Sequence, residues 1–290
     1  MELSASLRER VLAFQRLELT EHEIYARLAQ TLPQGENRRI LERIAADELR
    51  HARDWQAITG QEVKPKRLWV FFYTWIARIF GLTFGLKLME RGEERAQGVY
   101  KELLGVIPNV EAWLKDEEEH EHQLLGMLEE ERLHYAGSVV LGLNDALVEL
   151  TGALAGLTLA LQNTKLIALS GLITGIAASL SMAASEYLST RSEGTEKHPL
   201  RAAVYTGIAY ILTVLLLVLP YLLFASYYLD LALTLLVAVF IIAVFNFYIS
   251  VAKDEPFGRR FAEMALLSFS VAALSFGVGF LARQLLGVEV

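Results

Sequence analysis

Two copies of one short motif place carboxylates and a histidine at helical spacing. The stretches DELRH at 47–51 and DEEEH at 116–120 both read Asp-Glu-x-x-His. A separation of three residues puts the Glu and the His on one helical face, where both can reach one metal ion. A single such pair is common on solvated helices. Two copies on alternate helices are much less common by chance, so the doublet predicts a metal site.

The elements that carry these motifs are expected to be helices packed in pairs. Apolar residues recur at helical spacing over 4–31, 37–58, about 87–104 and 110 to about 134, which favours a four-helix bundle. Glu48 and Glu117 lie on the apolar stripes of their helices rather than on the wet faces. A carboxylate on a buried stripe is costly unless it is paired or metal-bound. The alternative, a plain bundle with solvated acids, explains these positions less well.

The first and third helices each add one inward acid. Glu18 and Glu93 lie on apolar stripes, and each is followed seven residues later by a tyrosine, Tyr25 and Tyr100. The halves of the bundle therefore look like two copies of one helix pair. On the third helix the adjacent Glu94 remains an alternative to Glu93. The expected core comprises Glu18, Glu48, His51, Glu93, Glu117 and His120.

Composition limits the metal chemistry. The chain has no cysteine, which excludes disulfides, thiolate zinc sites and iron–sulfur clusters. Any metal must therefore use nitrogen and oxygen ligands, with methionine as the only sulfur. Four carboxylates and two imidazoles suit iron or manganese. The net charge of −7 argues against nucleic acid as a partner, because its binders carry a basic face.

Charge is distributed unevenly, which indicates two different solvents. The first 136 residues hold 43 charged side chains, and the remaining 154 hold 18. Apolar runs at about 137–161, 166–188, 202–224, 229–251 and 262–285 are each long enough to cross a hydrocarbon core of ~30 Å. We therefore expect an all-α protein with a four-helix metal-binding domain at 1–135 and a five-helix transmembrane bundle at 136–290.

The loops between these spans predict an orientation. Basic residues between spans two and three and between spans four and five are Arg191, Lys197, Arg201, Lys253, Arg259 and Arg260, whereas the opposite side has Lys165 and Arg283. By the positive-inside rule the loops with the larger group face the cytoplasm. We expect the protein to lie in the cell membrane. This orientation puts the amino terminus inside and the carboxyl terminus outside. The first residues agree, because they read as a charged helix start rather than a signal peptide.

A second kind of membrane contact is predicted within the first domain. Residues 68–86 are aromatic and nearly uncharged, interrupted by Arg78. The stretch is long enough to span a bilayer at ~20 residues. However, it runs directly into charged helix at Lys87, and its Trp and Tyr content suits an interface. A membrane-surface or re-entrant position is favoured, and crossing remains the alternative.

Few ionisable groups occur within the predicted spans. The first span carries Asp145 and Glu149 one turn apart, and the second carries Met182 and Glu186 at the same spacing. Three acids and one thioether can pass a divalent cation, and protonation of an acid can couple its release to a proton gradient. Capping of helix ends near headgroups is the alternative for Asp145 and Glu186. Glu149 lies too deep in the predicted span to cap a helix end.

The first 135 residues, with their Asp-Glu-x-x-His doublet, resemble the rubrerythrin or erythrin branch of the ferritin-like di-iron proteins. The resemblance implies a di-iron site. It also implies a second metal-binding glutamate on the third helix, a role that Glu90 matches three residues before Glu93.

Residues 137–288 resemble the vacuolar iron transporter family. The matching stretches are GLNDALVELTGALAG in the first span and SMAASEYLS in the second. The resemblance implies a homodimer, Fe²⁺/H⁺ antiport and a path along the first two spans, in which Asp145, Glu149, Met182 and Glu186 hold path positions. Plant members carry a long acidic extension between spans two and three, which is absent from the short link at about 190–200.

These observations favour a transporter of Fe²⁺, or of Mn²⁺, that exports the ion from the cytoplasm after a cytosolic di-metal domain has captured or sensed it. The rival is a membrane-anchored di-iron ferroxidase or peroxidase, which Tyr25 and Tyr100 would suit. An anchor needs no acids inside its spans. Asp145, Glu149 and Glu186 therefore favour transport.

Overall fold

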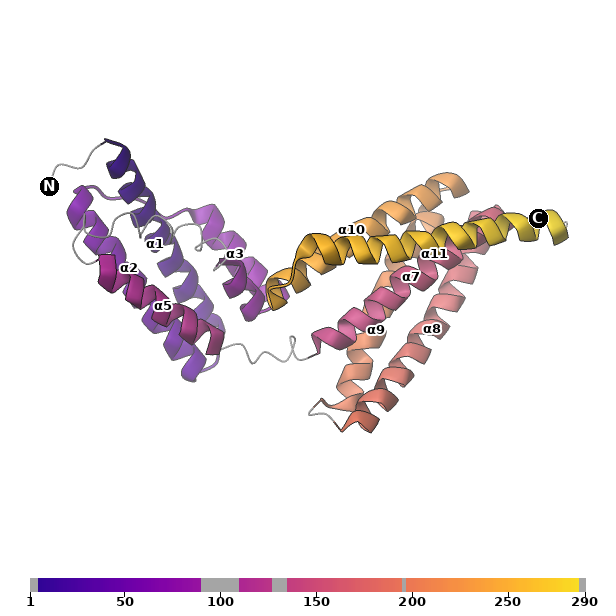
Figure 1. The fold of residues 1–290 in the computed structure, drawn as a ribbon, viewed down its shortest axis with the longest axis horizontal. Helices are drawn as coiled ribbons and strands as arrows, with labels where there is room; N and C mark the ends of the chain where they lie inside the picture. The colour runs from indigo at the N-terminus through magenta and orange to yellow at the C-terminus, as the bar shows by residue number, and fades with distance from the viewer. Residues whose placement is uncertain (1–4, 90–109, 127–134, 195–196, 287–290) are drawn as a thin grey trace. The chain divides into compact units, whose positions relative to one another are not determined.

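The computed structural model of the chain describes residues 5–89, 110–126, 135–194 and 197–286, and every secondary-structure element in these ranges is a helix. The chain divides into two compact units, Met1–Glu130 and Glu131–Val290, which we call the first and second units (Figure 1). The predicted all-α class is confirmed for the described residues.

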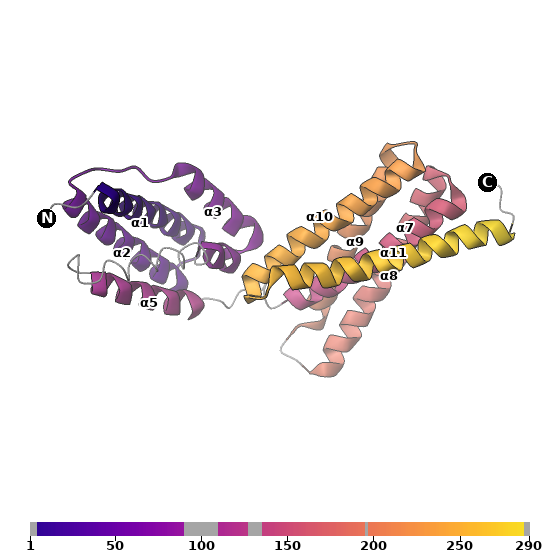
Figure 2. The same ribbon diagram turned by 45° about the horizontal axis from the view of Figure 1, so that its top comes forward.

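The first unit is built on a pair of long helices, α1 (Ala5–Thr31) and α2 (Glu36–Thr59), which lie side by side (Figure 2). Helix α2 ends at Gly60, whose φ of 64° lies in the left-handed region that favours glycine and whose N–H donates to the carbonyl of Gln56. Helix α5 (Val110–Gly126) packs on α2, and α3 (Arg67–Phe80) packs on α1.

Two apolar clusters pack this unit, and acidic residues lie between them along the helices. One cluster contains Ile24 and Ile44, and the other contains Val11 and Trp55. On α1, Glu18 falls between the residues of the two clusters. On α2, Glu48 and His51 fall between Ile44 and Trp55. The helices therefore bury a polar layer within an otherwise apolar core.

The aromatic stretch 68–86 is not one continuous helix. Helix α3 ends at Phe80, Gly81 has a φ of 103°, and helix resumes over 82–89. Fourteen helical residues reach about 21 Å, which is less than a ~30 Å hydrocarbon core. The bundle helix predicted at about 87–104 lies mostly outside the described residues. The four-helix bundle therefore remains a prediction.

The second unit contains five long apolar helices: α7 (Ala136–Leu161), α8 (Thr164–Glu193), α9 (Pro199–Leu223), α10 (Tyr227–Lys253) and α11 (Phe257–Leu286). All five are long and apolar enough to cross a membrane. They coincide with the five predicted runs, so the prediction of five membrane-capable helices is confirmed.

Glycine lets α7 approach its neighbours closely. A Cβ added at Gly142 would collide with the backbone of Thr206 on α9, and one at Gly156 would lie 2.9 Å from the carbonyl oxygen of Ser275 on α11. Small residues permit such backbone contacts between helices in membranes. These glycines therefore position α7, the helix that carries Asp145 and Glu149.

Candidate metal site

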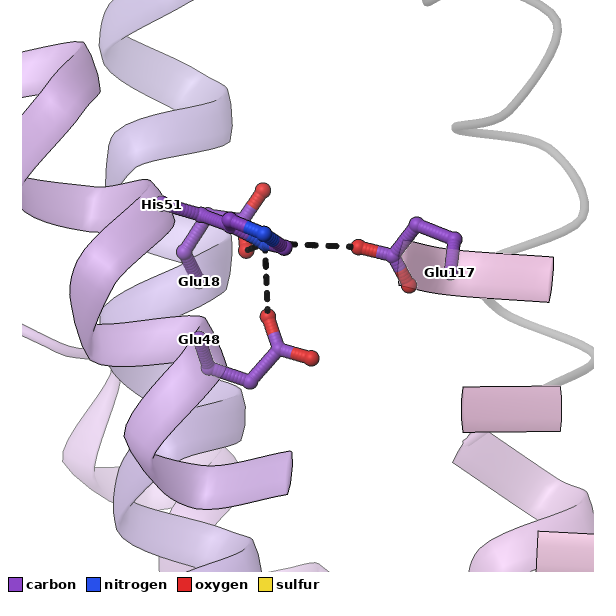
Figure 3. Close-up of side chains that lie close together, drawn as sticks. All are labelled: Glu18, Glu48, His51 and Glu117. Atoms are coloured by element: carbon purple, nitrogen blue, oxygen red, sulfur yellow. Dashed lines mark ion pairs between the residues drawn. The ribbon is translucent and has the colours of Figure 1, made fainter. Parts of the chain in front are cut away.

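Four side chains with metal-binding atoms converge inside the first unit. Glu18 from α1, Glu48 and His51 from α2, and Glu117 from α5 each place a ligand atom within 4.8 Å of the others. Figure 3 shows these side chains pointing toward one another from facing helices. In the part of the chain that the structure describes, no other group of three or more His, Asp or Glu side chains meets this criterion.

The distances place both predicted imidazoles against the same glutamates. His51 Nδ1 lies 3.6 Å from Glu18 Oε2 and 3.8 Å from both Glu48 Oε2 and Glu117 Oε1. His120 Nδ1 lies 3.2 Å from Glu48 Oε1 and 3.9 Å from Glu117 Oε2. The structure therefore brings together five of the predicted ligands. Glu90 and Glu93, with the alternative Glu94, lie outside the described residues.

The buried atoms of this cluster that have no hydrogen-bond partner among the described residues include Glu48 Oε2, His51 Nδ1 and His120 Nδ1. A buried polar atom is costly unless it is bonded. A cation would give all three a partner at once, because carboxylate oxygen and neutral imidazole nitrogen are both metal ligands. The donor set therefore fits a divalent ion such as Fe²⁺ or Mn²⁺.

The aspartates of the two motifs cross over to hold the two imidazoles. His51 Nε2 lies 3.1 Å from Asp116 Oδ2, and His120 Nε2 lies 3.3 Å from Asp47 Oδ2. Arg50 donates to both aspartates, at 2.9 Å to Asp47 Oδ1 and 2.7 Å to Asp116 Oδ2. Carboxylates behind metal-binding histidines fix the orientation and tautomer of the rings. Here they leave each Nδ1 directed at the glutamates.

Sequence reasoning did not assign a function to Asp47, Asp116 or Arg50. The signal was present, since an aspartate occupies the first position of both motif copies. The partner of each aspartate could not be inferred from that position. It depends on how α5 is rotated against α2, which spacing within one helix does not specify.

Burial and like charge govern protonation in this cluster. Burial, with the nearby carboxylates of Glu117 and Glu18, holds the pKa of Glu48 well above its usual range. Burial alone would lower the pKa of His51, but the carboxylates of Glu18 and Asp116 outweigh it, and the pKa is raised. The pKa of His120 is lowered by burial, which Asp47 only partly offsets. A cation would reverse the penalty on Glu48 by favouring its charged form.

Two tryptophans lie beside the cluster. The ring of Trp113 is 6.2 Å from that of His51 and 4.5 Å from that of Trp55, measured between centroids. Both rings are buried. The chain has four tryptophans in all, and each belongs to the first unit, at positions 55, 69, 75 and 113. Tryptophan fluorescence therefore reports on this unit alone.

The predicted path residues of the second unit lie on two neighbouring helices. Ser138 Oγ donates to Glu186 Oε1 at 2.6 Å, which joins α7 to α8, and Tyr210 OH of α9 donates to Glu149 Oε2 at 2.9 Å. Asp145, Met182 and Glu186 are half-buried, whereas Glu149 is exposed on the single chain. Within the described ranges, no hydrogen bond or ion pair joins Asp145 or Glu149 to Met182 or Glu186. The path remains a prediction.

Comparison with known proteins supports the membrane half of these expectations. Residues 136–197 match the model of the VIT family. The match covers α7 and α8 and includes all four predicted path positions, Asp145, Glu149, Met182 and Glu186. No curated protein matches the chain. With its five membrane-capable helices, the chain is a multi-pass membrane protein whose resemblance to the VIT family indicates transport of a metal ion.

Proposed function

We propose that this protein exports Fe²⁺, with Mn²⁺ as the alternative cargo, and that the first unit captures the ion before the second unit carries it across the membrane. One observation supports the proposal above all others. A buried cluster of Glu18, Glu48, His51 and Glu117 occurs in the same chain as a match to the VIT family. Ligands for one class of ion thus occur in both halves.

The distribution of basic residues supports an orientation that suits export. Basic residues gather at the helix ends that flank the α8–α9 and α10–α11 links, for example Arg191, Lys253 and Arg260. By the positive-inside rule these links face the cytoplasm, which puts the first unit inside and the carboxyl terminus outside. A domain that binds metal on the cytoplasmic side suits export, and protonation of path acids would couple export to a proton gradient.

Glu149 gives a reason to propose a homodimer. Its side chain is exposed on a helix that crosses the membrane. An uncovered carboxylate at membrane depth is costly, so such groups face a protein interior or a water-filled path. A second copy of the chain would cover Glu149 and complete a path between protomers. The hydrogen bond from Tyr210 holds the carboxylate in place on one side.

Metal uptake into proteoliposomes tests the path. Asp145→Asn and Met182→Ala should each abolish most of the Fe²⁺ transport. The matched control is Glu193→Gln at the exposed end of α8, where the carboxylate only accepts a hydrogen bond from Ser189. This control should transport as the wild type does. Normal transport by both path variants would refute the assignment of these residues.

A separate measurement tests the first unit. Glu48→Gln should lower the metal content of the purified full-length protein, while transport at saturating Fe²⁺ continues. Export at low Fe²⁺ should fall, because the captured ion is no longer supplied. If Glu48→Gln binds as much metal as the wild type, the buried cluster is not the capture site.

The second candidate function is oxidation of Fe²⁺ by O₂ or peroxide in the first unit. The observation that favours it is a pair of buried, redox-capable rings, Trp113 and Trp55, beside His51. Stopped-flow absorbance of the full-length Asp145→Asn variant separates this activity from transport. Formation of Fe³⁺ on mixing with O₂ or peroxide would establish the oxidase. An absorbance trace equal to that of Glu48→Gln in both mixtures would exclude it.

A further inference from the structure

The large apolar side chains that are exposed in the described part of the first unit lie on one short helix. Among its described residues, the large hydrophobic side chains that are exposed are Leu68, Trp69, Phe71, Phe72, Trp75 and Ile79. All six belong to α3. Soluble surfaces rarely gather so many large apolar groups in one place, and such patches mark interaction sites.

Helix α3 is apolar on two sides that have different surroundings. Val70, Ile76 and Ala77 are buried, and Val70 and Ala77 pack with residues of α1 and α2. Leu68, Phe72, Trp75 and Ile79 recur at spacings of three and four residues, which forms one continuous exposed stripe. The buried side fixes the helix to the unit. Along this stripe the exposed fraction of the side chains ranges from 45% at Ile79 to 84% at Leu68.

Charge along this segment has one sign. Helix α3 contains Arg67 and Arg78 and no acidic residue, and Lys64 and Lys66 precede it. Basic residues beside an aromatic apolar stripe match the chemistry of an anionic bilayer surface, where headgroups attract the cations and Trp rings settle at the boundary with the acyl chains.

The covalent connection to α7 limits the distance between the first unit and a bilayer that α7 would cross. Residues 127–135 join α5 to α7, the first membrane-capable helix. Even fully extended, this connection covers only about 30 Å. The first unit is therefore tethered close to a membrane surface, and docking through α3 needs no encounter from solution.

We propose that α3 lies in the headgroup region of the membrane, parallel to its surface, and docks the metal-binding unit there through the stripe Leu68, Phe72, Trp75 and Ile79. The helix is too short to cross, because its 14 residues reach about 21 Å. Anionic phospholipid is the occupant, and it is recognised by the apolar stripe and by Lys64, Lys66, Arg67 and Arg78.

Lipid-borne quenchers test the proposal in the full-length protein. The protein is reconstituted into vesicles of anionic phospholipid with bromine either near the headgroups or near the chain ends. Because all four tryptophans belong to the first unit, the membrane helices add no signal. We expect strong quenching by the shallow bromines and weak quenching by the deep ones. Stronger quenching by the deep bromines would mean insertion across the core and would overturn the surface docking.

Variants identify the residues that are quenched. The double variant Trp69→Phe/Trp75→Phe should lose the lipid quenching, because the remaining Trp55 and Trp113 are buried in the unit. The charge variant Lys64→Glu/Lys66→Glu/Arg67→Glu should lose it too, with the Fe²⁺ content unchanged as proof of folding. Quenching that persists in either variant would overturn the assignment to α3.

A second copy of the chain is the competing occupant of the stripe. If copies of α3 covered one another, Trp69 and Trp75 would not be quenched by lipid of either kind, and a cysteine introduced at Phe72 would form a disulfide between two chains. That result would overturn the membrane assignment. The test does not depend on transport, so failure here leaves the proposed export function standing.

Discussion

The imidazole of His51 lies 3.1 Å from the carboxylate of Asp116, which belongs to the other copy of the motif. The reciprocal pair, His120 and Asp47, are 3.3 Å apart. The histidine of each motif is thus oriented by the aspartate of the facing helix. The two motifs form one site only when α2 and α5 are packed together.

Removing one orienting aspartate should weaken metal binding without deleting a ligand. We expect Asp116→Asn to lower the affinity for Fe²⁺ roughly 10- to 100-fold, because the ring of His51 loses its charged partner. Titration of the full-length protein with the metal measures the change. The control is Glu119→Gln on the exposed side of the same helix, where the carboxylate accepts a hydrogen bond from Gln123. Equal affinities for the two variants would contradict the orienting role.

Metal binding should be visible in tryptophan fluorescence. Fe²⁺ or Mn²⁺ held beside His51 would quench Trp113, whose ring centroid lies 6.2 Å from that of His51. Trp113→Phe should remove most of the quenching, whereas Trp69→Phe should leave it intact. Quenching that is unchanged in Glu48→Gln would show that the ion binds elsewhere.

Stability of the metal-free protein should depend on pH through Glu48. Its pKa is raised by burial and by neighbouring carboxylates, so the neutral form is favoured in the folded unit. The contribution of Glu48 to the unfolding free energy should therefore be fully present below the ordinary glutamate pKa and should be lost as pH rises through the raised value. Glu48→Gln should reduce this loss. Thermal unfolding followed by tryptophan fluorescence at pH 4 to 8 measures this pH dependence. An identical pH dependence in Glu48→Gln would show that Glu48 is not its cause.

Close packing of α7 should make Gly142 intolerant of a methyl group. Gly142→Ala would press a Cβ against the backbone of Thr206, and we expect a loss of about 1–3 kcal/mol in unfolding free energy. Gly277→Ala is the matched control, because nothing lies within 4 Å of its added Cβ. Calorimetry in detergent compares the two. A Gly142→Ala protein as stable as the control would mean that α7 and α9 are farther apart.

Tyr210 should matter for transport through its hydroxyl. Tyr210→Phe removes the hydrogen bond of 2.9 Å to Glu149, so the carboxylate loses its fixed position and uptake into proteoliposomes should fall severalfold. Tyr221→Phe serves as the control, because that hydroxyl pairs instead with Thr158. Similar uptake by both variants would indicate that Glu149 needs no support from α9.

The sequence predicted what depends on spacing along one helix. Glu48 and His51 share a face because three residues separate them, and the apolar runs predicted the five long helices. Apart from the shared core of predicted metal ligands, contacts between helices were not predicted. The hydrogen bond from Tyr210 to Glu149 depends on how α9 packs on α7, and the one from Ser138 to Glu186 depends on how α7 packs on α8. No local sequence pattern encodes this packing.

One local feature was also missed. The stretch 68–86 was treated as a continuous segment, although Gly81 breaks it with a φ of 103°. A glycine within an apolar run does not indicate whether the helix breaks there, because glycine also occurs within membrane helices. The break is decided by tertiary packing, since 82–89 contributes Leu86 and Met89 to the core of the first unit.

The short connection at residues 127–135 limits how far the first unit can lie from the start of α7. A short linker makes an encounter between two linked units an intramolecular event, which is favoured over an encounter from bulk solution. Under the proposed function, direct transfer of an ion between the units would avoid dilution. Lengthening this connection should then lower export at limiting Fe²⁺.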